Sequence, residues 1–562
     1  MKFNKIIAAV LCFILAFAAV GCSRDQGGEK ENKNMTQLYI GVFEGGLGSD
    51  WIYAIKKDFE EKYADVSFED GKTGVQLRIT ESRAFTSDFG TEGTVNMSQE
   101  VIFAEGAATL AAAEKGDFLD ITDVVTKPLN YDFVRKTTSK DGETATIESK
   151  MSESQQEYYS AIEGKYYALP TVEAYMGIAY DIELFEENNL YFKPDGTFVT
   201  SKTDTRGSGP DGDPETEWDN GLPQTYEQFY KLCAKIKNEL GIIPLMWAGA
   251  LQEMVSFLLL SLEADDLGAE QMYLNYDYDG IMENPIVGFD ASGKPQYGEK
   301  VEISAKNGYE LYKQSGKYNA LKFIEGIIDN EYYNVSNGTS NSFNHQDAEG
   351  VFVSAKYDSN MERAAMLVDG NWWQSEAKGV FADWEAEKGA EASMQNRKFG
   401  MMPLPKSSSD KLGEMTLLTY QGHIGFINSH IAENKIDLAK AFLQYCYTEP
   451  ALRTYTLTTN VCRPVEYSMG DDYEKLSSHG QICYDLHLSA KKVSMESASK
   501  INRNYNTEIW YAPNLWLSNV NGTTYTYPST AMINGNISAQ DYFTGLSRYW
   551  TPEVWAATFK NV

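Results

Sequence analysis

The 562-residue chain is poor in cysteine and histidine, with six of the first and five of the second. So few cysteines, without a closely spaced C-x-x-C pair, exclude a disulfide-stabilised scaffold. Cys233 and Cys446 fall on the apolar faces of predicted helices, and we interpret both as buried thiols. A bridge between Cys462 and Cys483 is compatible with the sequence, and so are two free thiols.

Marks of common enzyme classes are also missing. The five histidines form neither H-E-x-x-H nor H-x-x-x-H, and no G-x-S-x-G occurs. Carboxylates are numerous, but no spacing marks the pair that a glycosidase holds about 5–10 Å apart. We therefore predict a protein that is not an enzyme and has no catalytic residues.

Basic residues are scarce relative to acidic ones. The chain has 49 lysines and arginines against 80 aspartates and glutamates, for a formal net charge of −31. Such a chain repels polyphosphates, so we predict that it does not bind nucleic acid. An acidic protein can bind neutral ligands as well as cationic ones, so the net charge does not indicate which of the two classes the ligand belongs to. A chain of this length is long enough to form two lobes. We expect the protein to be a monomer.

The apolar run Ile6–Val20 is too short for the roughly 20 residues of a membrane-spanning helix. Two lysines precede it and Gly21-Cys22 follows it, which is typical of a secretory signal. The ending Ala-Val-Gly-Cys resembles a bacterial lipobox, whose cysteine is acylated; an ordinary signal peptide with an incidental cysteine is the alternative. We predict a signal peptide at 1–21, lipidation at Cys22 and a flexible tether at 22–37. This places the protein on the extracellular face of a bacterial membrane, in a Gram-positive cell.

The first folded segment has an α/β pattern. A strand-like run, Leu38–Phe43, leads through a glycine turn to a helix that begins after Ser49, and a second strand is predicted near Val75–Ile79. A later helix is indicated by Thr225 and Gln228, which fit a capping box. The predicted class is therefore α/β.

Two stretches, 201–221 and 334–350, are predicted to be polar connections. The first alternates acidic residues around a glycine, as the oxygen ligands of calcium do in some loops. The spacing does not fit an EF-hand, and a solvated acidic loop is the alternative. Calcium is the one cofactor we consider. Its candidate ligands are Asp211, Asp213, Glu215, Glu217 and Asp219.

Five stretches resemble, in order, the family 1 extracellular solute-binding proteins, the carbohydrate-type receptors of ABC importers, a class that includes maltose-binding protein. They are GKYYALPTVEAY at 164–175, PQTYEQF at 223–229, AMLVDGNWW at 365–373, FGMMPLP at 399–405 and DLAKAFLQYCY at 437–447.

The resemblance implies a two-lobed periplasmic-binding-protein-like fold whose lobes are joined by a three-segment hinge. We expect crossings between the lobes near 170–175, 400–405 and 450–458. The predicted lobes are 38–170 with 404–452 for the N-lobe, and 171–403 with 453–562 for the C-lobe.

Trp372 and Trp373 are the strongest candidates for ligand contact. The run 365–368 is apolar and strand-like, and Asp369, Gly370 and Asn371 turn the chain. Open α/β sheets bind ligands at such strand ends. In the resembling family a tryptophan at this place stacks on sugar. Because adjacent side chains point in different directions, we expect one tryptophan in the cleft and the other in the core.

Other candidates lie on predicted loops and strand ends. The loop that begins at Glu44 carries glycines that let a ligand approach, and it lacks a phosphate-binding motif. For each candidate the alternative is a purely structural role. The full set of predicted ligand-binding residues is Glu44, Gly45, Asp50, Glu105, Glu173, Tyr175, Trp247, Asn371, Trp372, Trp373, Arg463 and Trp510.

Together these features predict a lipid-anchored solute receptor that delivers its ligand to ABC permease subunits in the membrane. A sugar or oligosaccharide, bound in the cleft between the lobes, is the favoured ligand. The supply of aromatic plates, 10 tryptophans and 36 tyrosines, is compatible with it. A binder of peptides or other organic solutes, and a surface glycan-processing enzyme, are the alternatives.

Overall fold

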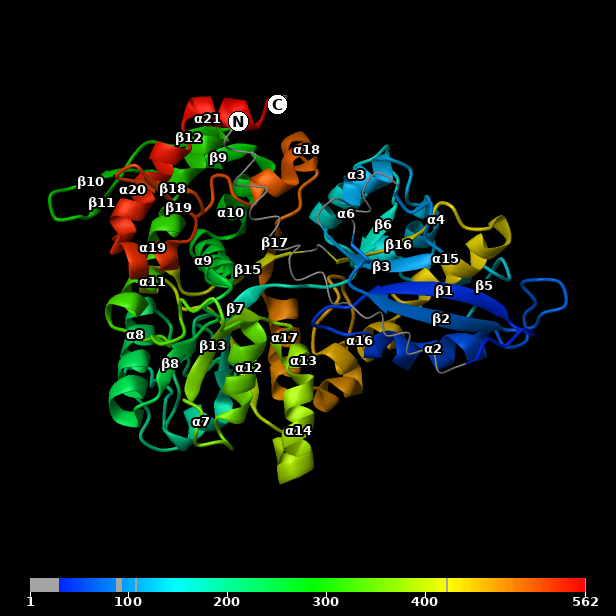
Figure 1. Ribbon diagram of the computed structural model, residues 1–562, viewed down its shortest axis with the longest axis horizontal. Coiled ribbons are helices and arrows are strands. Elements are labelled where there is room, and N and C mark those ends of the chain that lie inside the picture. Colours follow the sequence, from blue (N-terminus) through cyan, green and yellow to red (C-terminus); the bar gives the residue numbers. More distant parts are fainter. Residues whose placement is uncertain (1–29, 87–92, 107–108, 421–422, 561–562) are drawn as a thin grey trace. The chain divides into compact units, whose positions relative to one another are not determined.

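A computed structural model describes residues 30–86, 93–106, 109–420 and 423–560 (Figure 1). The chain divides into two compact units. The smaller unit consists of Met1–Val172, Gly422–Thr458 and Arg463–Ser468, and the larger unit of Glu173–Gln421, Thr459–Cys462 and Met469–Val562. Among the described residues, no helix combines the length and the apolar composition that a membrane crossing requires.

The smaller unit is built on a five-stranded sheet in the order β2-β1-β3-β16-β6. β1 runs parallel to β2 and β3, whereas β16 is antiparallel to β3 and β6. The strands are β1 (Thr36–Phe43), β2 (Val75–Ser82), β3 (Val101–Glu105), β16 (His423–Ile427) and β6 (Ala168–Pro170), with a short hairpin of β4 (Tyr131–Asp132) and β5 (Thr137–Thr138).

Helices of the smaller unit follow the apolar periodicity of the sequence. In α2 (Asp50–Lys62), Trp51, Ile52, Ile55 and Phe59 recur at helical spacing and all four are buried. The others are α3 (Thr109–Glu114), α4 (Thr122–Thr126), α5 (Ile147–Lys150), α6 (Glu153–Tyr159), η5 (Glu433–Lys435), α15 (Ile436–Tyr445) and α16 (Glu449–Thr459), whose last residue belongs to the larger unit.

The larger unit is built on a four-stranded sheet in the order β14-β7-β13-β8. β13 is parallel to β8 and antiparallel to β7, and β14 is antiparallel to β7. The strands are β14 (Phe399–Met402), β7 (Met176–Asp181), β13 (Ala364–Gly370) and β8 (Ile243–Met246).

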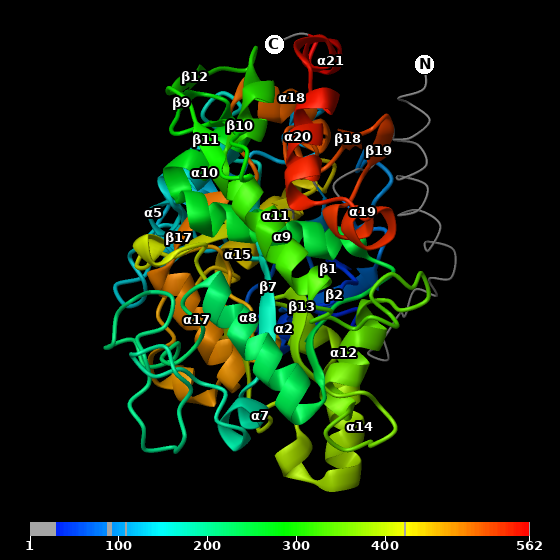
Figure 2. The same cartoon turned by 90° about the vertical axis from the view of Figure 1, so that its left-hand side faces the viewer.

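Both faces of this sheet are covered by helices, so its side chains alternate between two hydrophobic cores. On β13, Met366 and Val368 enter one core, and Leu367 enters the other. α9 packs on β7 and β13, α12 on β13, and α17 beside β14. Figure 2 shows α8, α9 and α12 around β7 and β13.

The helices of the larger unit are α7 (Ile182–Glu187), α8 (Tyr226–Lys235), η1 (Ile236–Leu240), α9 (Gln252–Leu267), α10 (Ala269–Asp277), η2 (Gly308–Lys313), α11 (Ser315–Asp329), α12 (His345–Ser354), α13 (Trp373–Glu376), α14 (Lys378–Lys388), η3 (Ala390–Ala392), η4 (Ser409–Lys411), η6 (Gly470–Lys475), α17 (Ser478–Ser489), α18 (Lys500–Ile509), α19 (Pro528–Gly535), α20 (Ala539–Tyr549) and α21 (Pro552–Thr558).

Four two-stranded pairs complete the larger unit. They are β9 (Gly280–Met282) with β12 (Val301–Ile303), β10 (Ile286–Phe289) with β11 (Pro295–Tyr297), β15 (Thr416–Thr419) with β17 (Lys491–Ser494), and β18 (Ser518–Val520) with β19 (Thr523–Tyr525).

The division into units differs from the predicted lobes in one long stretch. Residues 404–421, predicted in the N-lobe, belong to the larger unit. There β15 pairs in parallel with β17, and the Lys406 ammonium lies 2.7 Å from the Asp265 carboxylate. Residues 453–458 and 463–468, predicted in the C-lobe, belong to the smaller unit. The second passage of the chain between the units therefore comes near residue 421 and not at 400–405.

The four cysteines of the described chain are buried and form no disulfide with one another. Cys233 and Cys446 are the buried helix residues that the sequence predicts. Burial raises the pKa of both thiols. Cys462 and Cys483 are not bridged, which decides the alternative that the sequence left open. Cys22 lies outside the described residues, and its lipidation stays a prediction.

Candidate functional site

The carboxyl ends of β8 and β13 and the amino end of β7 meet at one edge of the larger unit's sheet. This edge gathers Glu173, Tyr175, Trp247, Asn371 and the two adjacent tryptophans. Strand ends of open α/β sheets are the usual place for a ligand, because loops there bring polar side chains together.

One of the two adjacent tryptophans lies in the core, and contact of the other with a ligand stays a prediction. Trp373 is fully buried, and its ring lies edge-on to Phe399 at 5.1 Å and to His479 at 5.6 Å. Trp372 is half-buried, and its Nε1 donates a hydrogen bond to Glu376 Oε2 at 3.1 Å. Of the two, Trp372 is the one that can offer a ring face to a ligand.

Gly370 makes room for the Trp372 ring. A Cβ at residue 370 would lie 2.2 Å from ring carbons of Trp372, which is far inside van der Waals contact. A side chain here would displace the ring from the strand end. The glycine of the D-G-N-W-W run thus fixes where the tryptophan sits.

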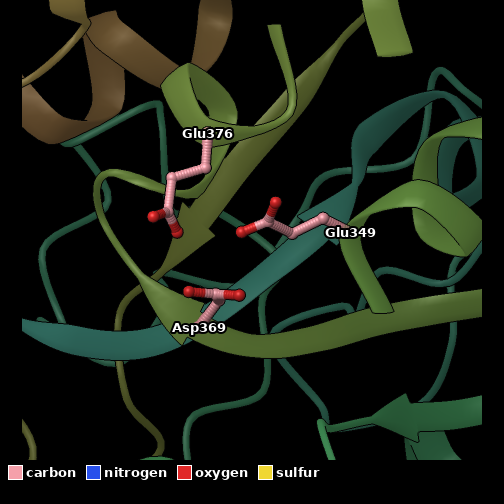
Figure 3. A group of neighbouring side chains, drawn as sticks. All are labelled: Glu349, Asp369 and Glu376. Atoms are coloured by element: carbon pink, nitrogen blue, oxygen red, sulfur yellow. The ribbon is translucent and has the colours of Figure 1, made fainter. Parts of the chain in front are cut away.

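Beside Trp372, three carboxyl groups converge from three elements: Glu349 of α12, Asp369 of β13 and Glu376 of α13 (Figure 3). Each offers an oxygen within 4.8 Å of the others, and Glu349 and Asp369 are each 1 % exposed. Figure 3 shows the carboxyl oxygens directed toward one another. Burial, together with the charges of neighbouring carboxylates, raises the pKa of Glu349 and of Asp369. The raised pKa favours the protonated form of both groups, so carboxyl groups crowd together here without a lysine or arginine partner among the described residues.

Asn371, Glu173 and Tyr175 form a bracket that ties β13 to the start of β7. The Asn371 amide donates to the Glu173 carbonyl at 2.8 Å, and its side-chain oxygen accepts from the Tyr175 N–H at 3.2 Å. All three residues are buried. We interpret their polar groups as holding the edge in shape, and ligand contact by these residues stays a prediction.

The Glu173 carboxylate binds two basic side chains within the larger unit. His487 Nδ1 lies 3.0 Å from Oε1, and Lys492 Nζ lies 2.9 Å from Oε2. Burial by itself would raise the pKa of Glu173, but the positive charges of His487 and Lys492 prevail and set it at about 2. Glu173 is therefore ionised at neutral pH.

Trp247 and Trp510, the other predicted aromatic contacts in this unit, differ in exposure. Trp247 has no exposed surface, stacks on Tyr333 at 4.6 Å and donates from Nε1 to the Gly338 carbonyl. A ring covered on all sides has no face for a ligand, so the structure gives Trp247 a core role. Trp510 is half-buried against Tyr420, with ring centroids 5.1 Å apart.

In the smaller unit, the predicted ligand-binding residues lie at or just after the ends of different strands. Glu44 and Gly45 lie half-buried in the loop after β1, and Asp50 is exposed as the first residue of α2. Glu105 ends β3, with its carboxylate 3.5 Å from His423 Nε2. These residues are accessible, and their contact with a ligand stays a prediction.

Arg463 is enclosed by aromatic rings of the smaller unit. Its guanidinium lies 4.2 Å from the ring centre of Tyr455 and 4.7 Å from that of Trp51, and it donates to the Thr171 carbonyl. The residue is 1 % exposed. Cation–π contacts of this kind hold an interior together, so the structure gives Arg463 a packing role.

The acidic loop 211–219 uses its carboxylates mainly for turns. Asp211 Oδ1 accepts from the Asp213 N–H, and Asp213 Oδ1 from the Glu215 N–H. Asp219 is buried, and burial together with the Asp211 charge raises its pKa to about 8. In the part of the chain that the structure describes, the grouping of three potential metal ligands occurs at Glu349, Asp369 and Glu376 and not in this loop. Calcium in the loop stays a prediction.

A groove of about 480 Å³ lies along another face of α12. Gln346, Gly350 and Ser354 line it together with Phe343 and Val380. Neither Trp372 nor the three carboxyl groups belong to its lining, so the groove is separate from the sheet edge.

The fold is shared with proteins that bind oligosaccharides. A chitin oligosaccharide binding protein superposes with a TM-score of 0.53 at 13% identity over 94% of this chain and 100% of its own. The cyclic alpha-maltosyl-1,6-maltose binding protein of Arthrobacter globiformis gives 0.51 at 12% identity, again over 94% and 100%. A protein from a study of xylan utilization by Caldanaerobius polysaccharolyticus gives 0.52 at 11% identity, over 91% and 99%.

The chain has their fold. The two-lobed periplasmic-binding-protein-like α/β class predicted from the sequence is thereby confirmed. No protein-family model matches the chain, and no curated protein matches it.

None of the three members of the carboxyl cluster was among the predicted site residues, and Asp369 was assigned only to the turn after the strand-like run. Glu349 stands in the stretch predicted to be a polar connection, and Glu376 comes three residues after Trp373. One signal was present: Asn344 and Asp347 form a capping box that starts α12 and so turns Glu349 toward β13. No signal marks Glu376.

Proposed function

We propose that this protein is a solute-binding receptor that captures a sugar or oligosaccharide and delivers it to the permease subunits of an ABC importer. The observation that carries the proposal is a fold shared over nearly the whole chain with two oligosaccharide-binding proteins. Trp372, half-buried at the sheet edge, supplies the chemistry that such a ligand needs.

A sugar presents C–H groups on its faces and hydroxyl groups on its edges. An aromatic ring covers the faces, and carboxylates accept hydrogen bonds from the hydroxyls. Trp372 and Glu376 lie side by side, joined by the Nε1–Oε2 hydrogen bond. We propose that the Trp372 ring stacks on a sugar and that no covalent chemistry follows.

Replacing Trp372 with alanine should weaken oligosaccharide binding about tenfold, since the loss of an aromatic contact of roughly 1.4 kcal/mol corresponds to that factor. Isothermal titration calorimetry with chito-, malto- and xylo-oligosaccharides measures the effect. Trp384→Ala is the matched control: Trp384 is also half-buried in the larger unit and also uses Nε1, which donates to Ser354 Oγ.

The outcomes separate the proposal from its rivals. Absence of binding across the oligosaccharide panel, with binding of a peptide or another solute, would overturn the sugar ligand. Appearance of shortened oligosaccharides during incubation would show an enzyme. An equal loss of affinity in Trp372→Ala and Trp384→Ala would remove Trp372 from the site.

We further propose that the receptor is held on the extracellular face of the membrane by acylation of Cys22. The support is the lipobox-like Ala-Val-Gly-Cys ending and the polar stretch that follows it. Cys22→Ala should release the protein into the medium or leave the leader uncleaved. Detergent phase partition and mass spectrometry of the N-terminus measure both, and an unchanged membrane fraction would contradict the anchor.

A further inference from the structure

Among the residues that the structure describes, the carboxyl cluster of Glu349, Asp369 and Glu376 has no lysine or arginine partner. In the described chain, the only ion-pair neighbour of the three is His345, whose Nε2 lies 3.9 Å from Glu376 Oε1. Other buried carboxylates of this unit, such as Glu173 and Glu263, are paired with lysine. The cluster therefore differs from these other buried carboxylates, each of which has a basic partner.

Two oxygen atoms in the cluster are also without hydrogen bonds. Glu349 Oε1 and Asp369 Oδ2 are buried and have no hydrogen-bond partner. Two other oxygens of the cluster do have partners: Asp369 Oδ1 accepts from the Gly370 N–H, and Glu376 Oε2 accepts from Trp372 Nε1. Figure 3 shows both unpartnered groups facing the centre of the cluster. A buried carboxyl oxygen without a partner is destabilising, so these atoms indicate a missing ligand.

We propose that Glu349, Asp369 and Glu376 bind a calcium ion beside Trp372. Calcium takes oxygen ligands at about 2.3–2.6 Å, so two oxygens of one ion lie at most about 5 Å apart. The mutual separations in the cluster, within 4.8 Å, fit this limit. An all-carboxylate set favours a hard cation over a soft one, and magnesium would retain several waters that so buried a site has little room for.

The burial also argues against an ammonium group of a solute as the occupant. Glu349 and Asp369 are each 1 % exposed, and the Glu376 side chain is 14% exposed. A small ion can enter past Glu376, whereas an amine on a larger molecule would have to bring its own body into the core. The cluster is therefore suited to a free ion.

The ion would also act on the sugar site, a consequence that rests on the proposed function. Glu376 would ligate calcium through one oxygen while its Oε2 holds Trp372 Nε1. Partners of this kind orient a side chain and typically change affinity severalfold. Calcium should therefore raise the affinity for oligosaccharide by fixing the Trp372 ring.

The test is a titration of chelator-treated protein with calcium, followed by calorimetry, and with terbium, whose luminescence is sensitised by Trp372 and Trp373. We expect one site per chain. Glu349→Gln and Glu376→Gln should each weaken binding at least tenfold. Asp213→Asn, in the exposed acidic loop, is the matched control and should leave it unchanged.

A second readout guards against a misfolded variant. In chelator, Glu349→Gln should melt at or above the wild-type temperature, because it replaces a carboxyl group crowded by Asp369 and Glu376 with an amide that cannot ionise. Calcium should raise the melting temperature of the wild type and not that of Glu349→Gln. No stoichiometric binding, or a loss of binding in Asp213→Asn instead, would overturn the calcium site.

Calcium binding and sugar binding can be lost independently of each other. Calcium binding without any sugar binding would keep the cation site and reject the sugar receptor. Sugar binding by protein that takes up no calcium would do the reverse.

Discussion

Replacing Lys317 with methionine should lower the free energy of unfolding of the larger unit by about 3–5 kcal/mol, because it leaves Glu263 buried without its cation. Both side chains have no exposed surface, and Lys317 Nζ lies 2.5 Å from Glu263 Oε1. The ammonium also donates to Asn275 Oδ1 at 2.9 Å and to Gln314 Oε1 at 3.2 Å. Three acceptors around one lysine mean that α9, α10 and the start of α11 are joined through it.

The double variant Lys317→Met with Glu263→Met should recover most of this loss, since apolar groups of similar volume need no cation. Lys231→Met is the matched control: Lys231 pairs with Glu227 at 2.8 Å on the exposed face of α8. An exposed pair contributes at most about 1 kcal/mol. Urea unfolding followed by circular dichroism measures all three. A Lys317→Met protein as stable as Lys231→Met would show that the buried pair carries no net stability.

Local structure near the N-terminus was predictable because its signals are local. The predicted strand Leu38–Phe43 lies within β1, and the helix expected after Ser49 is α2. An alternating or 3.6-residue pattern reports which side of an element is buried, without any knowledge of its partner. The buried state of Cys233 and Cys446 followed from the same periodicity.

The unit boundary was not predictable in the same way. Residues 404–421 belong to the larger unit because β15 pairs with β17, about 75 residues later, and because Lys406 reaches Asp265, 141 residues earlier. Neither partner is visible in a local pattern. Sequence motifs place a segment within a familiar order of elements, but pairing between distant segments decides which core the segment joins.

For the candidate site, the sequence pointed to residues that meet at one strand end, but it could not assign their roles. It selected Asn371, Trp372 and Glu173, which the structure does bring to one strand end. Whether a polar side chain there faces a ligand or ties two strands together depends on burial, and Asn371 and Glu173 are 2% and 1% exposed. The sequence does not report the burial of an individual polar side chain, so it cannot distinguish a ligand contact from a structural hydrogen bond.

The carboxylate of Glu173 should make the stability of the larger unit depend on pH between about 4.5 and 2. Its pKa falls from the ordinary 4.5 to about 2 on folding, because His487 and Lys492 outweigh the effect of burial. A group whose pKa is lower in the folded state stabilises it above the unfolded pKa. That contribution, about 3 kcal/mol from a shift of this size, is lost as the pH falls through the folded pKa.

Glu173→Gln should therefore unfold more easily than wild type by about 3 kcal/mol at pH 7, and by less at each step below pH 4.5. The two curves of unfolding free energy against pH should converge near pH 2, measured by urea unfolding at several pH values. Glu299→Gln, an exposed glutamate in the same unit, is the matched control and should follow wild type throughout. If the curves of unfolding free energy against pH for Glu173→Gln and wild type run parallel, the variant is destabilised by poorer packing and not by the loss of the carboxylate charge. The hydrogen bonds of Asn371 would then hold the start of β7 in place, and the ion pairs of the Glu173 carboxylate with His487 and Lys492 would add nothing to them.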